Sequence, residues 1–132
     1  MTLGRVPANR GAPERAQATV EAAIVIPLVV VVAALLLQVA TVARDRVHLV
    51  SVTATAARSA MVEPRTAVAR RAAEASAGDL QLRSVSLRGP RNPGSLMVVE
   101  VSARPRRLPL VGLAVARLQL HESITVRVEG DG

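Results

Sequence analysis

The residue with the clearest potential for chemistry is Glu21, a carboxylate directly before a 22-residue segment, Ala22–Ala43, that contains no charged residue. An ionisable side chain in the centre of a membrane helix costs about 3 kcal/mol by insertion scales. Glu21 is therefore either a hydrated, inert residue among lipid headgroups or a group retained for assembly. The sequence around it has to decide between these two interpretations.

Other chemistry has little support in the sequence. His48 and His121 are the only histidines, they do not form a His-Glu-x-x-His pattern, and the chain has no cysteine. These features argue against a metal site. There is no serine in a nucleophile-elbow motif and no glycine-rich phosphate loop. We therefore expect neither an enzyme nor a bound cofactor.

The charge of the chain suggests acidic partners. The net charge is +7, all 17 basic residues are arginine, and there is no Phe, Tyr or Trp. A phosphate backbone would attract such a chain, but no aromatic ring is present to stack on a base, and the arginines are scattered. We therefore expect no nucleic-acid partner, and acidic lipid headgroups or anionic cell-wall polymers fit the charge better.

The uncharged segment has the length of a membrane anchor. As a helix, Ala22–Ala43 would be about 33 Å long, enough to cross a hydrocarbon core of about 30 Å. The apolar region of a secretory signal peptide is shorter, about 7–15 residues. Charge does not orient the segment, because three arginines precede it and three follow it: Arg5, Arg10, Arg15, Arg44, Arg46 and Arg58.

Polar residues inside the span have two possible uses. Gln38 and Thr41 could form hydrogen bonds to another helix, or they could simply reach the membrane interface. Pro27 removes one backbone hydrogen bond near Ala23, so a kink or a loosened turn is expected there. Such a flexible point at Pro27 could serve assembly by helping the helix leave the bilayer, although membrane helices also tolerate proline without any special role.

The rest of the chain predicts a small α+β domain. The helix is expected to continue with an apolar stripe, then break at Pro64 and restart up to about Ala77, with Gly78 as its C-terminal cap. Strands are predicted over Leu80–Leu87, Leu96–Ala103 and around Ile124–Val128, forming a three-stranded antiparallel sheet. The predicted stripe consists of Val47, Val50, Ala54, Ala57 and Met61.

Two further features belong to this domain. Without aromatic residues its core must be thin and made of Val, Leu, Ile, Met and Ala. The segment Arg104–Gln119 is broken by prolines and carries an apolar tip, Leu108–Val115. This tip is either a surface for a partner or a cover over the sheet.

The phrase Gln17-Ala18-Thr19-Val20-Glu21, preceded by the small residue Ala16 and an arginine-bearing leader, resembles the prepilin-peptidase site of type IV pilin-like proteins. With Ile26-Pro27 and the exit Ala43-Arg44-Asp45-Arg46, the chain most resembles the TadE/TadG-like pseudopilins of the tight-adherence (Flp, type IVc) pilus system, actinobacterial type. The resemblance covers most of the chain.

The resemblance implies a processed, assembling subunit. A prepilin peptidase would cut between Ala16, where the family usually has glycine, and Gln17, and Glu21 would pair with the new amine of a neighbouring subunit. The chain would then comprise a cytoplasmic leader (residues 1–16), a transmembrane pilin-like helix (17–46) and an exported α+β domain (47–132). Expected partners are the prepilin peptidase, other pilin-like subunits, the pilus assembly machinery and membrane lipid.

One alternative from a different class stays open. The chain could be an unprocessed single-pass membrane adaptor whose basic exported domain binds an envelope protein or an anionic polymer. In that case Glu21 would be an interfacial residue without a role in assembly.

Overall fold

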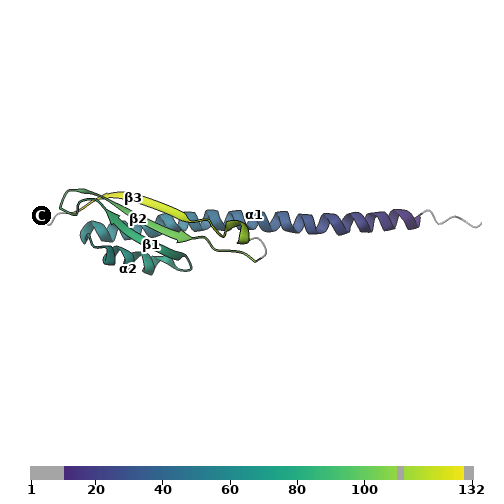
Figure 1. Ribbon diagram of the computed structural model, residues 1–132, viewed down its shortest axis with the longest axis horizontal. Coiled ribbons are helices and arrows are strands. Elements are labelled where there is room, and N and C mark those ends of the chain that lie inside the picture. The colour runs from purple at the N-terminus through teal and green to yellow at the C-terminus, as the bar shows by residue number, and fades with distance from the viewer. Residues whose placement is uncertain (1–10, 110–111, 130–132) are drawn as a thin grey trace, which may run out of the picture.

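The computed structural model describes residues 11–109 and 112–129. It confirms the predicted α+β fold, with one long helix, one short helix and a three-stranded antiparallel sheet. The long helix, α1 (Gly11–Val62), has 52 residues and a length of about 78 Å. Its C-terminal half lies along the short helix and the sheet, while its N-terminal half projects away from them alone (Figure 1).

The start of α1 differs from the expectation. The polar leader, residues 1–16, contains two glycines and two prolines and would from its composition be unstructured. This interpretation is wrong for residues 11–16, which form the first turns of α1. Alanine, glutamate and arginine favour helix, and a proline in the first turn, here Pro13, loses no intrahelical hydrogen bond. The rest of the candidate leader, residues 1–10, lies outside the described residues.

The short helix α2 (Thr66–Ala77) follows the predicted break at Pro64. It ends at Gly78, which has a φ angle of 53°. This left-handed backbone conformation is strained for residues with a Cβ atom, so glycine is the expected residue there. The predicted second helix and its cap are therefore confirmed.

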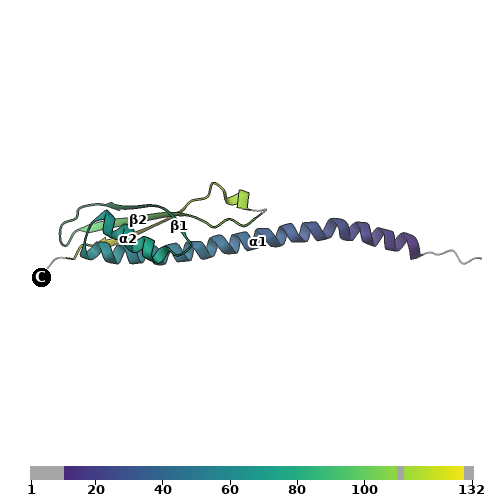
Figure 2. The same cartoon turned by 90° about the horizontal axis from the view of Figure 1, so that it is seen from below.

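The three strands are β1 (Gln81–Arg88), β2 (Leu96–Arg104) and β3 (Leu120–Arg127), in the order β1-β2-β3 with β2 central. Both pairings are antiparallel. The helices lie on one side of the sheet (Figure 2), with α1 against β2 and β3 and α2 against β1. The opposite face of the sheet is left to polar residues such as Ser84, which pairs with Ser102 at 2.6 Å between the hydroxyl oxygens.

The face of α1 that enters the core differs from the predicted stripe. Of that stripe only Ala57 is buried, whereas Val47 is 73% exposed and Val50 is 42% exposed. Two sets of apolar residues on this helix have helical spacing, and contacts with α2 and the sheet select the other one. The residues that are buried are Leu49, Val52, Thr53, Ala56, Ala57 and Ala60.

The core is built from small side chains. Every buried residue of α2 is an alanine: Ala69, Ala73 and Ala77, spaced one helical turn apart. Ala56 and Ala60 of α1 belong to the same core cluster, so the two helices can approach closely. Interiors at native density tolerate added volume poorly, since extra methylenes force side chains and backbone to shift.

This packing predicts that Ala73→Leu destabilises the domain, whereas Ala75→Leu does not. Ala73 is fully buried and Ala75 is exposed on the same helix. Overpacking costs about 1–3 kcal/mol, and the free energy of urea-induced unfolding, followed by circular dichroism in detergent micelles, measures it. Equal stability of the two variants would contradict the close approach of α1 and α2.

Candidate functional site

The N-terminal half of α1 is the candidate membrane span. Residues 17–37 are exposed apart from Ala34, which is half-buried. Within the described residues, α1 is the one helix long and apolar enough to cross a membrane, by length and composition. Its exposed side chains are almost all aliphatic, and soluble monomers rarely expose so large a continuous apolar surface. Lipid or other helices are the surroundings that such a surface requires.

Glu21 lies on an exposed face of this half of α1, surrounded by Gln17, Val20 and Ile24. Gln17 and Glu21 are one turn apart and therefore share that face. None of the ion pairs formed among the described residues involves Glu21. Once water is removed, its aliphatic neighbours offer nothing to solvate the carboxylate.

The candidate cleavage site lies inside the helix. Ala16 and Gln17 both belong to α1, close to its N-terminal end at Gly11. Helix ends open at a lower free-energy cost than helix centres. A peptidase would therefore have to unwind only the first turns of α1 to reach the bond between Ala16 and Gln17.

Pro27 lies inside α1 without ending it. Its ring removes the hydrogen bond to the carbonyl of Ala23, and the N-terminal half of the helix is bowed (Figure 2). Pro27 is not among the residues around Glu21. The structure thus brings Gln17 and Glu21 together and leaves Pro27 apart from them.

At the other end of the candidate span, Gln38 connects α1 to the segment that follows β2. Its side chain is only 2% exposed. The Nε2 group donates to the carbonyl of Arg106 at 3.0 Å, and Oε1 accepts from the N–H of Leu108 at 2.9 Å. Gln38 therefore finds its partners inside its own chain rather than on another helix, whereas Thr41 donates to the carbonyl of Leu37 at 2.8 Å.

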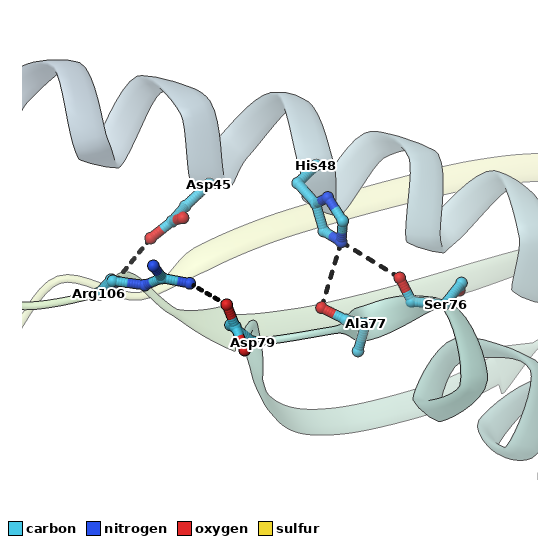
Figure 3. Close-up of polar contacts among 6 residues, drawn as sticks. All are labelled: Asp45, His48, Ser76, Ala77, Asp79 and Arg106. Atoms are coloured by element: carbon cyan, nitrogen blue, oxygen red, sulfur yellow. Dashed lines mark hydrogen bonds and ion pairs between the residues drawn. The ribbon is translucent and has the colours of Figure 1, made fainter.

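Asp45 adds a second connection two turns further along the same face. It is 9% exposed, and its Oδ2 accepts from the N–H of Arg106 at 2.6 Å. The Arg106 side chain extends to Asp79, with 2.9 Å between Nη2 and Oδ2 (Figure 3). We call Gln38, Asp45 and the backbone of residues 106–108 the junction. Charge-assisted hydrogen bonds of the Asp45 type are stronger than neutral ones, whereas the Arg106–Asp79 pair is exposed and contributes little.

His48, on the neighbouring turn of α1, holds the end of α2. Its Nε2 lies 3.2 Å from the carbonyl oxygens of Ser76 and of Ala77 (Figure 3). Both partners are acceptors, so Nε2 must carry the proton and donate. The last carbonyls of a helix lack intrahelical partners, and His48 supplies one. Among the described residues, no group of three or more His, Asp, Glu or Cys side chains is placed to hold a metal ion.

The junction was missed by sequence reasoning, although a signal for it exists. Gln38, Asp45 and Leu49 occur at helical spacings that place them on one face of α1, and this face leads into the buried one. A polar residue on that face of an otherwise apolar span indicates a partner. That the partner is the backbone near Arg106, 68 residues away, is not readable from local spacing.

Comparisons with family models, with curated proteins and with solved structures found no match to this chain.

The junction predicts that Gln38→Leu loosens the segment after β2, although leucine is the more apolar residue. The change leaves the Arg106 carbonyl and the Leu108 N–H without partners, which costs about 1–3 kcal/mol when such groups are buried. Hydrogen exchange in micelles should show a faster-exchanging Leu108 amide, and Val39→Leu, at a position that is 67% exposed, should not. Unchanged protection in Gln38→Leu would mean that the segment is held by other contacts.

Proposed function

We propose that this chain is a TadE-like pseudopilin or minor pilin component of a tight-adherence (Flp, type IVc) pilus or a related export apparatus. It acts by helix-mediated assembly in the membrane, with its α+β domain outside and its N-terminus in the cytoplasm. The observation that carries the proposal is Glu21, a carboxylate without an ion-pair partner among the described residues on a bare aliphatic helix.

The junction limits how the helix can sit in a bilayer. The junction is charged, because Arg44, Asp45 and Arg106 lie at or next to it. This part of α1 would therefore lie in water or among lipid headgroups rather than in hydrocarbon. The hydrocarbon layer can then start no further along α1 than Leu37. Ala22–Leu37 is 16 residues and spans about 24 Å, which is less than a core of about 30 Å.

This shortfall bears directly on Glu21. A core of about 30 Å takes about 20 helical residues, so counting back from Leu37 it reaches about Ala18. Glu21 would lie within the hydrocarbon layer unless the bilayer thins around the helix. A carboxylate at that depth favours a cation as a partner, because an unpaired charge there is costly.

Cleavage before Gln17 would create such a cation. The new amine would lie one turn from the carboxylate of its own chain and, in an assembly, next to that of a neighbour. Pairing between chains would set the axial register of adjacent helices, and the bare aliphatic surface of residues 17–37 would pack against the same neighbours. A subunit that keeps its leader has no free amine at Gln17, so it could not form this pair and would be a poor assembly partner.

The first test is the N-terminus of the protein isolated from membranes of cells with and without a prepilin peptidase. We expect a chain that begins at Gln17 only where the peptidase is present, by intact mass and N-terminal sequencing. A chain beginning at Met1 or Thr2 in both cells would overturn the proposal. The membrane-adaptor interpretation would then lead.

The second test uses the absence of lysine, which leaves the N-terminal amine as the only primary amine of the chain. A zero-length carbodiimide cross-linker should join the amine of one processed copy to Glu21 of another. The carbodiimide activates a carboxylate and glutamine has none, so in Glu21→Gln the cross-linked dimer should fall to background if Glu21 is the group that is linked. Glu21→Asp and the distant Glu74→Gln should retain it.

Peptide mapping of isotope-mixed samples would separate links between copies from links within one copy. A dimer of equal yield in Glu21→Gln would contradict a role of this carboxylate in pairing.

A further inference from the structure

The apolar tip of the segment after β2 is an apolar feature outside α1 that neither the core nor the proposed assembly uses. It contains the short 3-10 helix η1 (Gly112–Val115). Leu113 in η1 is 84% exposed and Leu118, just after it, is 42% exposed. Among the described residues, Leu113 is the most exposed large aliphatic side chain, and exposure of this degree needs a reason.

Hydrogen bonds on both sides of η1 hold its backbone, so the exposure of Leu113 belongs to a defined conformation of η1. The N–H of Gly112 donates to the carbonyl of Leu108 at 2.8 Å, and the Arg107 guanidinium donates to the carbonyl of Ala116 at 2.8 Å. Gly112 is packed so tightly that an added Cβ would lie 2.7 Å from the Cβ of Arg107. These contacts fix the backbone on either side of Leu113.

Further hydrogen bonds within and after η1 suit it to a less polar environment. The amides of Ala116 and Leu118 donate to the carbonyls of Leu113 and Val115, at 3.2 and 3.0 Å. Backbone groups that are already paired cost less to remove from water than free ones. A loop with this internal pairing can enter the headgroup layer at low cost.

The position of η1 relative to the candidate span indicates which surroundings it would contact. Gln38 bonds to the backbone at Arg106 and Leu108, so the segment leaves α1 at the level where the candidate span ends. Beyond that point η1 lies at the end of the domain that faces the projecting half of α1, and it stands off the helix rather than packing on it (Figures 1 and 2). If α1 crosses a bilayer, η1 therefore faces the surface of that bilayer.

Charge agrees with this placement. Arg107 and Arg117 flank η1 and are both exposed. Arginines beside an exposed aliphatic residue are the combination that binds an interface with acidic headgroups, since the guanidinium groups pair with phosphates while the aliphatic group enters the acyl boundary.

We propose that η1 is a second membrane contact of this protein. Leu113 inserts into the interfacial layer of the leaflet from which α1 emerges, with Arg107 and Arg117 on lipid phosphates. The domain is thereby held against the membrane at two points, α1 and η1. The proposal depends on α1 crossing the bilayer and does not depend on processing or on assembly with other subunits.

The chain has no tryptophan, so a single introduced one reports its own surroundings. The full chain would be reconstituted into vesicles of phosphatidylcholine and phosphatidylglycerol, with and without brominated acyl chains, as Leu113→Trp. Val31→Trp in the candidate span and Val62→Trp at the opposite end of the domain are the controls, at positions that are 51% and 72% exposed. All three sites are exposed, so the substitutions leave the fold intact.

We expect the emission of Leu113→Trp to be shifted toward shorter wavelength and quenched by brominated lipid, as for Val31→Trp, while Val62→Trp shows neither effect. Adding Arg117→Glu to Leu113→Trp should reduce the quenching. Emission of Leu113→Trp like that of Val62→Trp would overturn the proposal. A shifted but unquenched emission would also overturn it, since it would place Leu113 against protein. Loss of quenching in Val31→Trp would remove the premise that α1 crosses the bilayer.

Discussion

The two hydrogen bonds of the Gln38 amide are the constraint on which the rest of the structure depends. They attach the segment after β2 to α1 and thereby mark where the helix stops being free and becomes part of the domain. Three properties follow from that one position: the length of bare aliphatic helix, the depth that Glu21 would reach if α1 crosses a bilayer, and the level along α1 at which η1 lies. A side-chain amide suits this role because it satisfies a carbonyl and an N–H at once.

The domain owes its cohesion to backbone pairing and close helix packing more than to large side chains. Its core contains no aromatic residue, and the buried residues of α2 are alanines. Small side chains bury little area each, so stabilisation from apolar burial is modest. The sheet, the alanine contacts of the two helices and bonds such as that from His48 to the end of α2 have to supply the remainder. Such a domain gains from being attached to a long helix that a membrane or neighbouring subunits hold in place.

Local signals in the sequence predicted most of the fold. Pro64, Gly78 and the strand patterns led to α2 and the sheet, because backbone restrictions and alternation act over short distances. The buried face of α1 was predicted wrongly, because an alanine- and valine-rich helix carries more than one apolar stripe and only tertiary contacts choose between them. Glu21 could be identified from the sequence because it is a charged residue directly before a long apolar segment. The role of Gln38 was not, since its partners are distant in sequence and are backbone groups.

The continuity of α1 has a mechanical consequence. The candidate span and the central helix of the domain are one unbroken helix of 52 residues, with no linker between them. Because no linker interrupts α1, a tilt or rotation of the candidate span would carry the domain with it. If α1 is a membrane anchor, the domain would not reorient independently of it. A force along the axis of the candidate span would therefore reach the sheet through α1, in which Pro27 lacks one backbone hydrogen bond.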